Sequence, residues 1–284
     1  MCVSAIREIQ QDAGLEGSQV SNSVRGLQAG AILGVDEYRR VGNGIILVRQ
    51  QQQWLNRTYL EYTGLCACDG VYSRSTNKAL IYALQAEEGM PTSMANGNFG
   101  PSTRAYCPTI GATISGSGHS GTSYPTSKLT SFWHVAQIAL YCNGIDRYTG
   151  DEGSRYGSTS FDGSMGYGTM QALHLFQSDY GLATRDYIGL DEWMALLVST
   201  GNPERSATAC DCATQLTSVK AQRLHSEGYN IVGRYLTGTV GAGASKVAKN
   251  ISRAEAQRIF DSGMNFFCNL SRRRRLVAGP RIPT

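Results

Sequence analysis

No long apolar run is present in this sequence. Nothing approaches the ~18–20 consecutive apolar residues that a membrane-spanning helix requires, so we expect no transmembrane segment. Residues 1–14 contain Arg7, Glu8 and Asp12 and lack the apolar core of a secretory signal peptide. We therefore expect that an exported chain would use another route, or that Met1 is not the native start.

Charge is scarce as well, at 17% of the residues. Five arginines lie near the end of the chain, where Asp and Glu are absent. Without these five charges, the formal net charge of the chain falls from +4 to −1. A body so close to neutral has no broad basic surface, which argues against nucleic acid as a partner. We expect residues 271–284 to form a basic, disordered tail; the alternative is that its arginine run binds RNA or anionic lipid. These arginines are Arg272, Arg273, Arg274, Arg275 and Arg281.

The sequence also lacks cysteine and histidine residues at the spacing that is typical of a zinc site. The chain has 8 cysteines, but they form two C-x-C pairs and no C-x-x-C pair, and only 4 histidines accompany them. This pattern predicts no metal site, and nothing in the sequence indicates a cofactor. Two interpretations of the cysteines stay open: disulfides, which suit an exported protein, and buried free thiols.

The sequence does contain an internal repeat. An Asp-Gly pair, a threonine, an Ala-Leu pair, a glutamine and a glycine recur in the same order, at an offset of 93 residues until a one-residue deletion after the Ala-Leu pair. Gln10, Gly14 and Leu15 match only the second half of this unit. The two full sets are Asp69-Gly70, Thr76, Ala79-Leu80, Gln85 and Gly89, and Asp162-Gly163, Thr169, Ala172-Leu173, Gln177 and Gly181.

Each unit has the signals of a turn followed by a helix. The Asp-Gly pair favours a tight turn, because glycine accepts positive φ and aspartate bonds its own backbone. The threonine (Thr76 or Thr169) is a candidate N-cap, the apolar residues behind it form one helix face, and the glycine ends the helix. A further helix is expected before each unit, over 48–56 and 132–143. These patterns predict a mainly α protein with tandem three-helix modules.

The repeat also divides the chain into segments. Residues 1–35 are expected to be the C-terminal part of a unit whose front half is absent, and residues 48–108 and 135–198 are expected to be complete modules. Residues 109–134, which separate the two modules, are rich in Gly, Ser and Thr, and this composition predicts a linker.

The repeated residues resemble the peptidoglycan-binding domain family. The pattern of that family combines an Asp-Gly turn, a Gly-x-x-Thr helix start, an Ala-Leu pair, Phe-Gln and a Gly-Leu stop. The later copy follows this pattern, whereas Ser73 replaces the first glycine of the helix start in the earlier copy. The matching residues of the later copy are Gly166-Tyr167-Gly168-Thr169, Phe176-Gln177 and Gly181-Leu182.

This resemblance implies that the modules bind peptidoglycan, either its glycan or its stem peptide. Aromatic platforms suit such ligands, and four rings are candidate contacts: Tyr72, Tyr82, Tyr167 and Trp193. The alternative is that these rings pack the small cores of the modules.

From residue 207 the pattern changes to alternating strands and helices. A βαβαβ series of this kind is typical of a parallel sheet with right-handed crossovers. Ser252 is a candidate N-cap with Glu255 at the capping-box position. Strands are expected at 208–213, 229–236 and 264–268, and helices over 217–227 and after Ser252.

Residues 207–270 resemble the opening part of a glycoside-hydrolase-like TIM-type barrel, the lysozyme-related domain of unknown function 1906 type. The resemblance implies Asp211 as a catalytic carboxylate, with Arg234 and Tyr235 lining the substrate cleft, because such barrels carry functional residues at the C-terminal ends of their strands. The residues that carry it are Cys210-Asp211-Cys212-Ala213-Thr214, Gly228-Tyr229, Val232-Gly233-Arg234-Tyr235-Leu236, Ile251-Ser252 and Glu255-Ala256.

Glycosidic cleavage normally uses two carboxyl groups ~5–9.5 Å apart, and the second would come from a later strand. We therefore expect the barrel to be incomplete and inactive in this chain, and poorly stable alone because its edge strand is unpaired. A frameshift or a truncated gene product would account for the arginine-rich end. The alternative for Asp211 is a turn carboxylate without chemistry.

The sequence thus predicts a bacterial, secreted protein that binds the cell wall and lies outside the cell or on the wall. Its glycoside-hydrolase-like domain would be truncated. Two alternatives remain open: a cell-wall glycan hydrolase whose barrel is incomplete in this chain, and a helical protein-interaction module with no sugar ligand.

Overall fold

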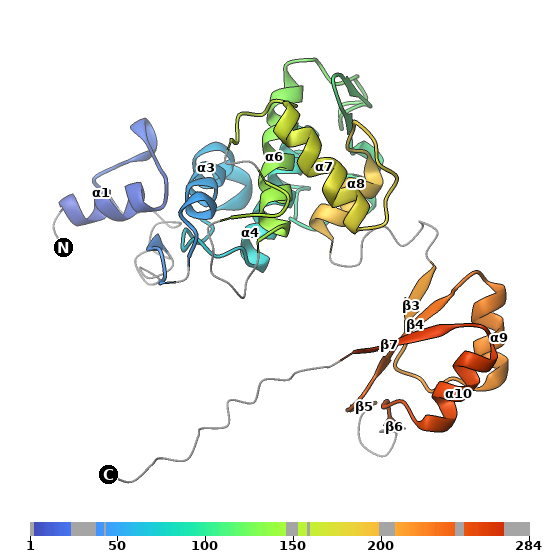
Figure 1. The fold of residues 1–284 in the computed structure, drawn as a ribbon. Helices are drawn as coiled ribbons and strands as arrows, with labels where there is room; N and C mark the ends of the chain where they lie inside the picture. The colour runs from blue at the N-terminus through green and yellow to red at the C-terminus, as the bar shows by residue number, and fades with distance from the viewer. Residues whose placement is uncertain are drawn as a thin grey trace, which may run out of the picture. The chain divides into compact units, whose positions relative to one another are not determined.

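The computed structural model describes residues 3–23, 38–42, 44–145, 153–157, 160–198, 208–241 and 247–269. The chain forms two compact units, Met1–Pro203 and Glu204–Thr284. Figure 1 shows helices as the main elements of the first unit and a small sheet with helices in the second. Helix dominates, as the sequence predicted. The predicted tail at 271–284 and the end of the predicted N-terminal repeat lie outside the described residues.

The first unit contains the two helices that were expected ahead of the Asp-Gly turns. The helices predicted over 48–56 and 132–143 are confirmed as α3 and α6, and both are longer than their apolar patterns indicated. The elements of this unit are α1 (Val3–Asp12), the 3-10 helix η1 (Gly17–Gln19), α3 (Ile46–Thr63), α4 (Arg74–Glu87), α5 (Pro101–Tyr106), β1 (Thr109–Ile110), β2 (Ile114–Ser115), α6 (Lys128–Asn143), α7 (Tyr167–Asp179) and α8 (Leu190–Leu197).

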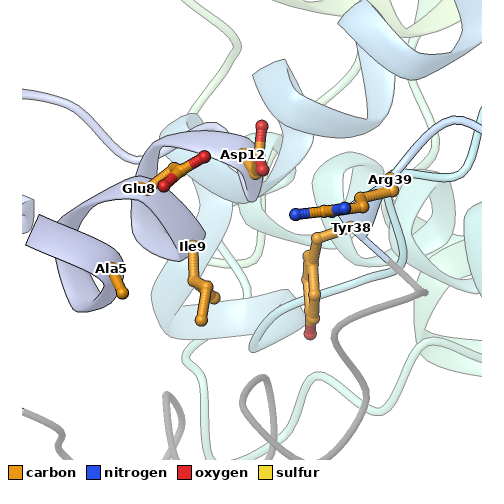
Figure 2. Close-up of a pocket in the computed structure, with 6 residues that line it drawn as sticks. All are labelled: Ala5, Glu8, Ile9, Asp12, Tyr38 and Arg39. Carbon is orange, nitrogen blue, oxygen red and sulfur yellow. The ribbon is translucent and has the colours of Figure 1, made fainter. Parts of the chain in front are cut away.

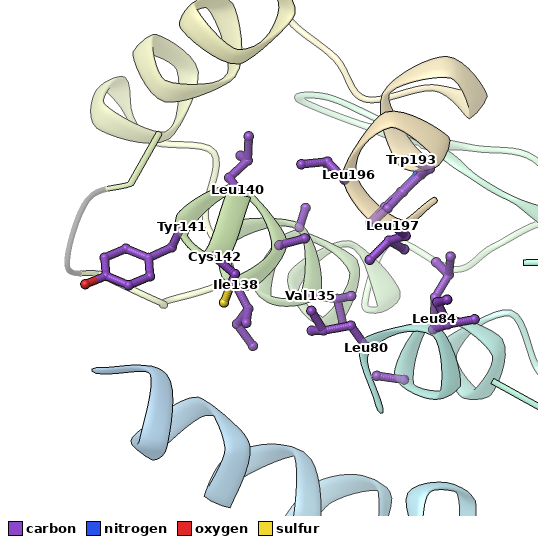
Figure 3. Packing of buried hydrophobic residues seen from close by; sticks show 14 of the residues in the cluster. Leu80, Leu84, Val135, Ile138, Leu140, Tyr141, Cys142, Trp193, Leu196 and Leu197 are labelled. Atoms are coloured by element: carbon purple, nitrogen blue, oxygen red, sulfur yellow. The ribbon is translucent and has the colours of Figure 1, made fainter. Parts of the chain in front are cut away.

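Helix α6 lies at the centre of this unit. From Phe132 to Cys142 every side chain except that of His134 is buried, and a helix that is apolar on all sides is typical of a core position. Helices α4 and α8 pack on it, with Leu84 and Leu197 facing α6 (Figure 3). The Asn77 side chain of α4 donates a hydrogen bond to the carbonyl oxygen of Leu197 at 2.8 Å. Helices from both predicted modules therefore share one core.

Both Asp-Gly turns and both glycine stops are confirmed. Gly70 and Gly163 have φ values of 81° and 70° in the turns, and Gly89 and Gly181 have φ values of 77° and 64° at the helix ends. Residues other than glycine adopt this region only with strain. The sequence could place these four positions because the backbone itself demands glycine there.

The predicted N-caps are wrong by three residues. Ser73 caps α4 and Gly166 caps α7, so Thr76 and Thr169 lie inside the first helical turn. Both threonines are buried. Their hydroxyl groups bond a side chain from the preceding helix, a partner that local sequence cannot indicate.

The segment 109–134 forms ordered structure where a linker was predicted. Strands β1 and β2 pair antiparallel, and Ile110, which is fully buried, also pairs with Ile188 ahead of α8. The indole Nε1 of Trp133 donates to the carbonyl oxygen of Gly111 at 3.0 Å. Composition missed this because the segment is held by backbone pairing, which needs no apolar stripe.

The N-terminal fragment docks on α3 through polar contacts. The Asn56 side-chain amide donates to the carbonyl oxygen of Ala13 at 2.9 Å, and that of Gln53 donates to the carbonyl oxygen of Asp12 at 2.8 Å. The Asp12 carboxylate also pairs with Arg49 at 3.2 Å. These contacts fix the end of α1 relative to α3.

The second unit has the predicted βαβαβ order, with an additional antiparallel pair, β5 and β6, that was not predicted between β4 and α10. Its three-stranded sheet has the order β3-β4-β7 with parallel pairing, and Cys210, Val232 and Phe266 lie side by side across it. Thr217 and Ser252 cap the two helices with their hydroxyl groups. The elements are β3 (Ala209–Asp211), α9 (Ser218–Ser226), β4 (Ile231–Tyr235), β5 (Thr239–Val240), β6 (Val247–Ala248), α10 (Arg253–Asp261) and β7 (Asn265–Asn269).

The seven cysteines within the described residues are all free thiols. Burial raises the pKa of the Cys66 thiol to about 12, so this group stays protonated and behaves as a small apolar side chain. Of the two interpretations left open by the sequence, the structure favours free thiols for these residues. None of the described helices combines the length and apolar character that a bilayer span needs.

Candidate functional site

The first Asp-Gly turn is organised around the buried side chain of Gln52 in α3. Its Oε1 accepts a hydrogen bond from the Gly70 amide at 2.9 Å, and its Nε2 donates to Asp69 Oδ1 and Thr76 Oγ1, each at 3.0 Å. The Val71 amide donates to Asp69 Oδ1 at 2.9 Å. One neutral side chain thus bonds the turn and the start of α4, and fixes both relative to α3.

The second Asp-Gly turn has the same arrangement around Gln137 in α6. The Gly163 amide donates to its Oε1 at 2.9 Å, and its Nε2 donates to Asp162 Oδ1 at 2.9 Å and Thr169 Oγ1 at 3.1 Å. The Ser164 amide donates to Asp162 Oδ1 at 2.8 Å. The hydrogen bond from Gln137 is the largest of the effects that lower the pKa of Asp162. Atom for atom, these four bonds repeat those of the first turn.

A further buried glutamine organises the chain after each glycine stop. Gln85 Oε1 accepts from the Gly97 amide at 3.0 Å, and its Nε2 donates to Thr103 Oγ1 at 2.9 Å. In the later copy, Gln177 Oε1 accepts from the Arg185 amide at 2.9 Å. Both glutamines were part of the sequence repeat, and both fix the approach of the chain to the next helix.

The N-terminal fragment contains the equivalent glutamine. Gln10 is buried, and its Oε1 accepts a hydrogen bond from the Ser21 amide at 2.8 Å. Gly14 then has a positive φ of 87°, in the same left-handed region as the glycine stops Gly89 and Gly181 of the two later copies.

Gln52 and Gln137 were not among the residues predicted from the sequence. The available signal is short: each glutamine precedes a buried leucine by three residues, Leu55 or Leu140. A Gln-x-x-Leu spacing is too common to distinguish a buried amide from an exposed one, so only the fold reveals the role of these two side chains.

The three candidate tyrosines differ in exposure. Tyr167 is 77% exposed at the start of α7, and its hydroxyl oxygen accepts a hydrogen bond from Gln171 at 2.6 Å. Tyr72 is half-buried and donates to Asn77 Oδ1 at 2.8 Å. Tyr82 is also half-buried. Tyr167 is therefore the tyrosine of this set whose ring is most accessible to a ligand.

Trp193 does not face solvent, contrary to the expectation of a ligand platform. Its side chain is fully buried, its Nε1 donates to the carbonyl oxygen of Pro108 at 3.0 Å, and its ring lies 6.5 Å from that of Phe132. The residue lies on the inward side of α8, where burial of its large apolar ring stabilises the core.

In the second unit, Asp211 ends β3 and Tyr235 ends β4. The Tyr235 hydroxyl donates to Asp211 Oδ2 at 2.8 Å, and Lys249 Nζ lies 3.9 Å from the centre of the Tyr235 ring. The hydrogen bond and the negative charge of Asp211 raise the pKa of Tyr235. Because the two strands are parallel, their carboxyl ends bring an exposed carboxylate and a phenol to one edge of the sheet. Lys249, which follows β6, adds an ammonium group beside the Tyr235 ring. Such groups can bond the hydroxyl groups of a sugar.

Arg234 lies in the core of the second unit, which corrects its expected place in a cleft. The guanidinium is fully buried and pairs with Glu255, with Nε to Oε1 at 2.8 Å. It also donates to the carbonyl oxygens of Cys212 and Lys249. Glu255 Oε1 accepts from the Leu216 amide at 2.7 Å. Successive residues of a strand point to opposite faces, so Arg234 points into the core, while Tyr235 has its hydroxyl on Asp211 at the sheet edge.

Glu255 is committed to this pair, since Oε1 and Oε2 both accept hydrogen bonds from Arg234. It is therefore not available as a second carboxyl group for Asp211. In the part of the chain that the structure describes, no three His, Cys, Asp or Glu side chains gather as a metal site would require.

Each unit contains a region that matches the model of a known protein family. A family model described as "FadG/YbfG, PGDB-like domain" matches residues 41–125, and one described as "Rv2525c-like, glycoside hydrolase-like domain" matches residues 222–277. The first match covers α3, α4, α5 and the β1–β2 hairpin, so it includes the beginning of the segment expected to be a linker. The second extends from within α9 past β7.

Two uncharacterized proteins of Bacillus subtilis (strain 168) are similar to 93% of the chain: YbfG, 40% identical over 264 residues, and FadG, 37% identical over 265 residues. The chain spans 33% of the length of YbfG and 41% of the length of FadG. No solved structure matches it. The chain thus combines a region similar to the PGDB-like domain with one similar to the glycoside-hydrolase-like domain, an architecture consistent with a cell-wall-related protein.

Proposed function

We propose that this chain binds bacterial peptidoglycan through two copies of one helical module, at residues 48–108 and 135–198. The observation that carries the proposal is the repeated glutamine-centred turn, in which Gln52 and Gln137 make the same set of bonds to an Asp-Gly pair and a threonine. The similarity of residues 41–125 to the PGDB-like domain supports peptidoglycan as the ligand.

Two copies packed in one core are expected to bind a polymer more tightly than two separate modules would. Helices α4, α6 and α8 pack together, so the spacing between the two copies does not depend on a flexible linker. Linked weak sites can exceed the affinity of one site by roughly 10²–10⁴-fold when a polymer presents repeated epitopes. Peptidoglycan is such a polymer, and the proposal locates the chain at the cell wall.

The ligand contact of the second copy is proposed to be Tyr167. It is the first residue of α7, and the position equivalent in the repeat is Arg74, the first residue of α4, which is also exposed. A ring and a guanidinium group both stack on or bond to polar ligands with apolar faces. The two copies would then contact the wall with different chemistry at the same point of the module.

The test is sedimentation of the full chain with insoluble peptidoglycan. We expect the chain to pellet with the wall material, and Tyr167→Ala to reduce the pelleted fraction several-fold. Phe260→Ala is the matched control, since Phe260 is an exposed ring of the second unit, 51% accessible. A chain that stays in the supernatant would favour the helical protein-interaction module instead. Equal losses for the two variants would remove Tyr167 from the site.

A second function, cleavage of wall glycan, is favoured by the Asp211–Tyr235 pair at the sheet edge. Under this proposal residues 207–270 are part of a TIM-type barrel and Asp211 is its catalytic carboxylate. The assay is the turbidity of purified walls. A fall in turbidity that Asp211→Asn abolishes, and that Phe260→Ala leaves intact, would support hydrolysis. A fall that Asp211→Asn retains would exclude Asp211 from it.

A further inference from the structure

A small pocket lies between α1 and the segment formed by Tyr38 and Arg39 (Figure 2). Its volume is about 130 Å³. Helix α1 contributes residues at positions i, i+3, i+4 and i+7, which share one helix face. The lining residues are Ala5, Glu8, Ile9, Asp12, Tyr38 and Arg39.

The inner wall of this pocket is fixed by packing. Tyr38 is 4% exposed and lies in an apolar cluster with Ala13 and Cys68, against which Ile9 also packs. Arg49 Nη2 donates a hydrogen bond to the carbonyl oxygen of Tyr38 at 3.0 Å. The backbone that presents the pocket is therefore held by α3, and the pocket does not need a ligand to form.

Opposite charges face each other across the pocket. In Figure 2 the Arg39 guanidinium extends toward α1, and the carboxylates of Glu8 and Asp12 lie on the helix side. Asp12 also pairs with Arg49 at 3.2 Å. Neither Glu8 nor Arg39 forms an ion pair with another residue that the structure describes. The pocket thus offers a cation and an anion whose charges a ligand could complement, beside an apolar strip made by Ala5 and Ile9.

We propose that this pocket binds a single amino acid or the end of a very short peptide. The ligand carboxylate would bond Arg39, its ammonium group would lie between Glu8 and Asp12, and a small side chain would contact Ala5 and Ile9. The opposite charges favour this class over a neutral sugar chain, because a zwitterion complements both Arg39 and Glu8 and an uncharged glycan complements neither. The proposal goes beyond the proposed function and rests on it for the ligand, since it adds to the two modules a site in the N-terminal fragment that recognises the stem peptide and not the glycan.

The experiment is a titration of the full chain with alanine and with alanyl-alanine, followed by the backbone amide signals of α1 and residues 38–39. We expect saturable shifts confined to these signals. Arg39→Gln and Glu8→Gln should each weaken binding about tenfold or more, since each removes a charge-assisted hydrogen bond. Arg7→Gln and Glu61→Gln are matched controls, because both residues are exposed and lie outside the pocket.

Blocked probes test the two ends of the ligand separately. Acetylated alanine lacks the ammonium group and alanine amide lacks the carboxylate, so each should bind about tenfold more weakly than alanine. Saturable shifts that Arg39→Gln and Glu8→Gln leave unchanged would overturn the proposal, as would the absence of any shift. Equal binding of acetate and alanine would also overturn it, because the pocket would then be a simple anion site.

Sedimentation with peptidoglycan separates this proposal from the proposed function. If alanine binds but the chain does not pellet, the pocket stands and wall binding fails. If the chain pellets normally while alanine produces no shift, wall binding stands and the pocket proposal fails. If the proposals are both correct, Arg39→Gln should lower the pelleted fraction while Arg7→Gln leaves it unchanged.

Discussion

The two units bury polar groups in different ways. The helical unit uses neutral amides: Gln52, Gln85, Gln137 and Gln177 are each at most 6% exposed, and each bonds the turn that it supports. The second unit instead buries one ion pair, Arg234 with Glu255, both fully inaccessible. A neutral amide that finds all its partners is inexpensive to bury, whereas a buried charge is costly to bury unless an opposite charge and further hydrogen bonds compensate it.

The same contrast extends to ionisable groups. In the helical unit Glu88 is fully buried, its carboxyl oxygens have no hydrogen-bond partner, and burial raises its pKa to about 9. Burial lowers the pKa of His134 to about 4, although the charge of Asp162 opposes this shift. Both groups are therefore neutral at pH 7. Burial thus neutralises these two groups of the helical unit, whereas the second unit buries Arg234 and Glu255 as a charged pair.

The largest effect is expected from Glu255→Gln. This change leaves the Arg234 charge buried without its counter-ion, which typically costs about 3–5 kcal/mol. The second unit has a small core of Leu216, Ala221, Val232, Ile259 and Met264, so we expect it to unfold while the helical unit remains protected. Hydrogen exchange resolved by segment measures this directly.

Glu227→Gln is the control for that prediction. Glu227 pairs with Arg223 at 2.8 Å on the surface of α9, and exposed pairs contribute about 0–1 kcal/mol. Similar exchange in the two variants would mean that the second unit does not depend on its buried pair.

The next largest effect tests the equivalence of the two turns. Gln52→Leu and Gln137→Leu each leave a buried amide N–H and a buried hydroxyl without a side-chain partner, at a cost of about 2–4 kcal/mol in total. Since the two glutamines make the same bonds, we expect equal losses in urea unfolding. Gln171→Leu, on the exposed surface of α7, should change the unfolding free energy by less than about 0.5 kcal/mol. If the losses of unfolding free energy in the two variants differ by more than a factor of two, the two turns are not energetically equivalent.

A stabilising change is expected at Glu88. A raised pKa means that the folded state is favoured fully below pH 4.5 and loses stability as the pH rises toward 9. Glu88→Met removes this loss and should raise the unfolding free energy by about 1–3 kcal/mol at pH 8 and little at pH 4. The neighbouring Glu87→Met should do the opposite, because Glu87 accepts hydrogen bonds from Tyr59 at 2.8 Å and Lys128 at 2.6 Å. Thermal melts at the two pH values would distinguish these outcomes.

The smallest effect concerns His134, which stacks on Trp54 at 3.8 Å between ring centres. Its lowered pKa makes the folded state take up a proton less readily than the unfolded chain, whose histidine titrates near 6.5. The contribution is complete above pH 6.5 and is lost as the pH falls toward 4, by about 1 kcal/mol because the ring is only half-buried and solvent screens it. His134→Phe should flatten this slope, and His225→Gln, in the other unit, should retain it. An unchanged slope in His134→Phe would assign the pH dependence to other groups.

Local features of the sequence were predicted well. The Asp-Gly turns, the glycine stops and the cap at Ser252 all follow from backbone conformation and side-chain hydrogen bonds over three or four residues. The order of strands and helices in the second unit followed from the same kind of pattern. Features that depend on contacts between distant residues were missed: Trp193 and Arg234 carry chemistry suited to a site, yet both lie in cores.

The sequence by itself determined where the chain turns, because only glycine accepts the left-handed backbone at Gly70, Gly89, Gly163 and Gly181 without strain. It could not determine which polar side chains are buried. That choice was made by tertiary packing, which brought Gln52 and Gln137 against the turns and Glu255 against Arg234. The physical reason is that a buried polar group is stable only beside its partner, and partners that lie far apart in the sequence meet only in the folded chain.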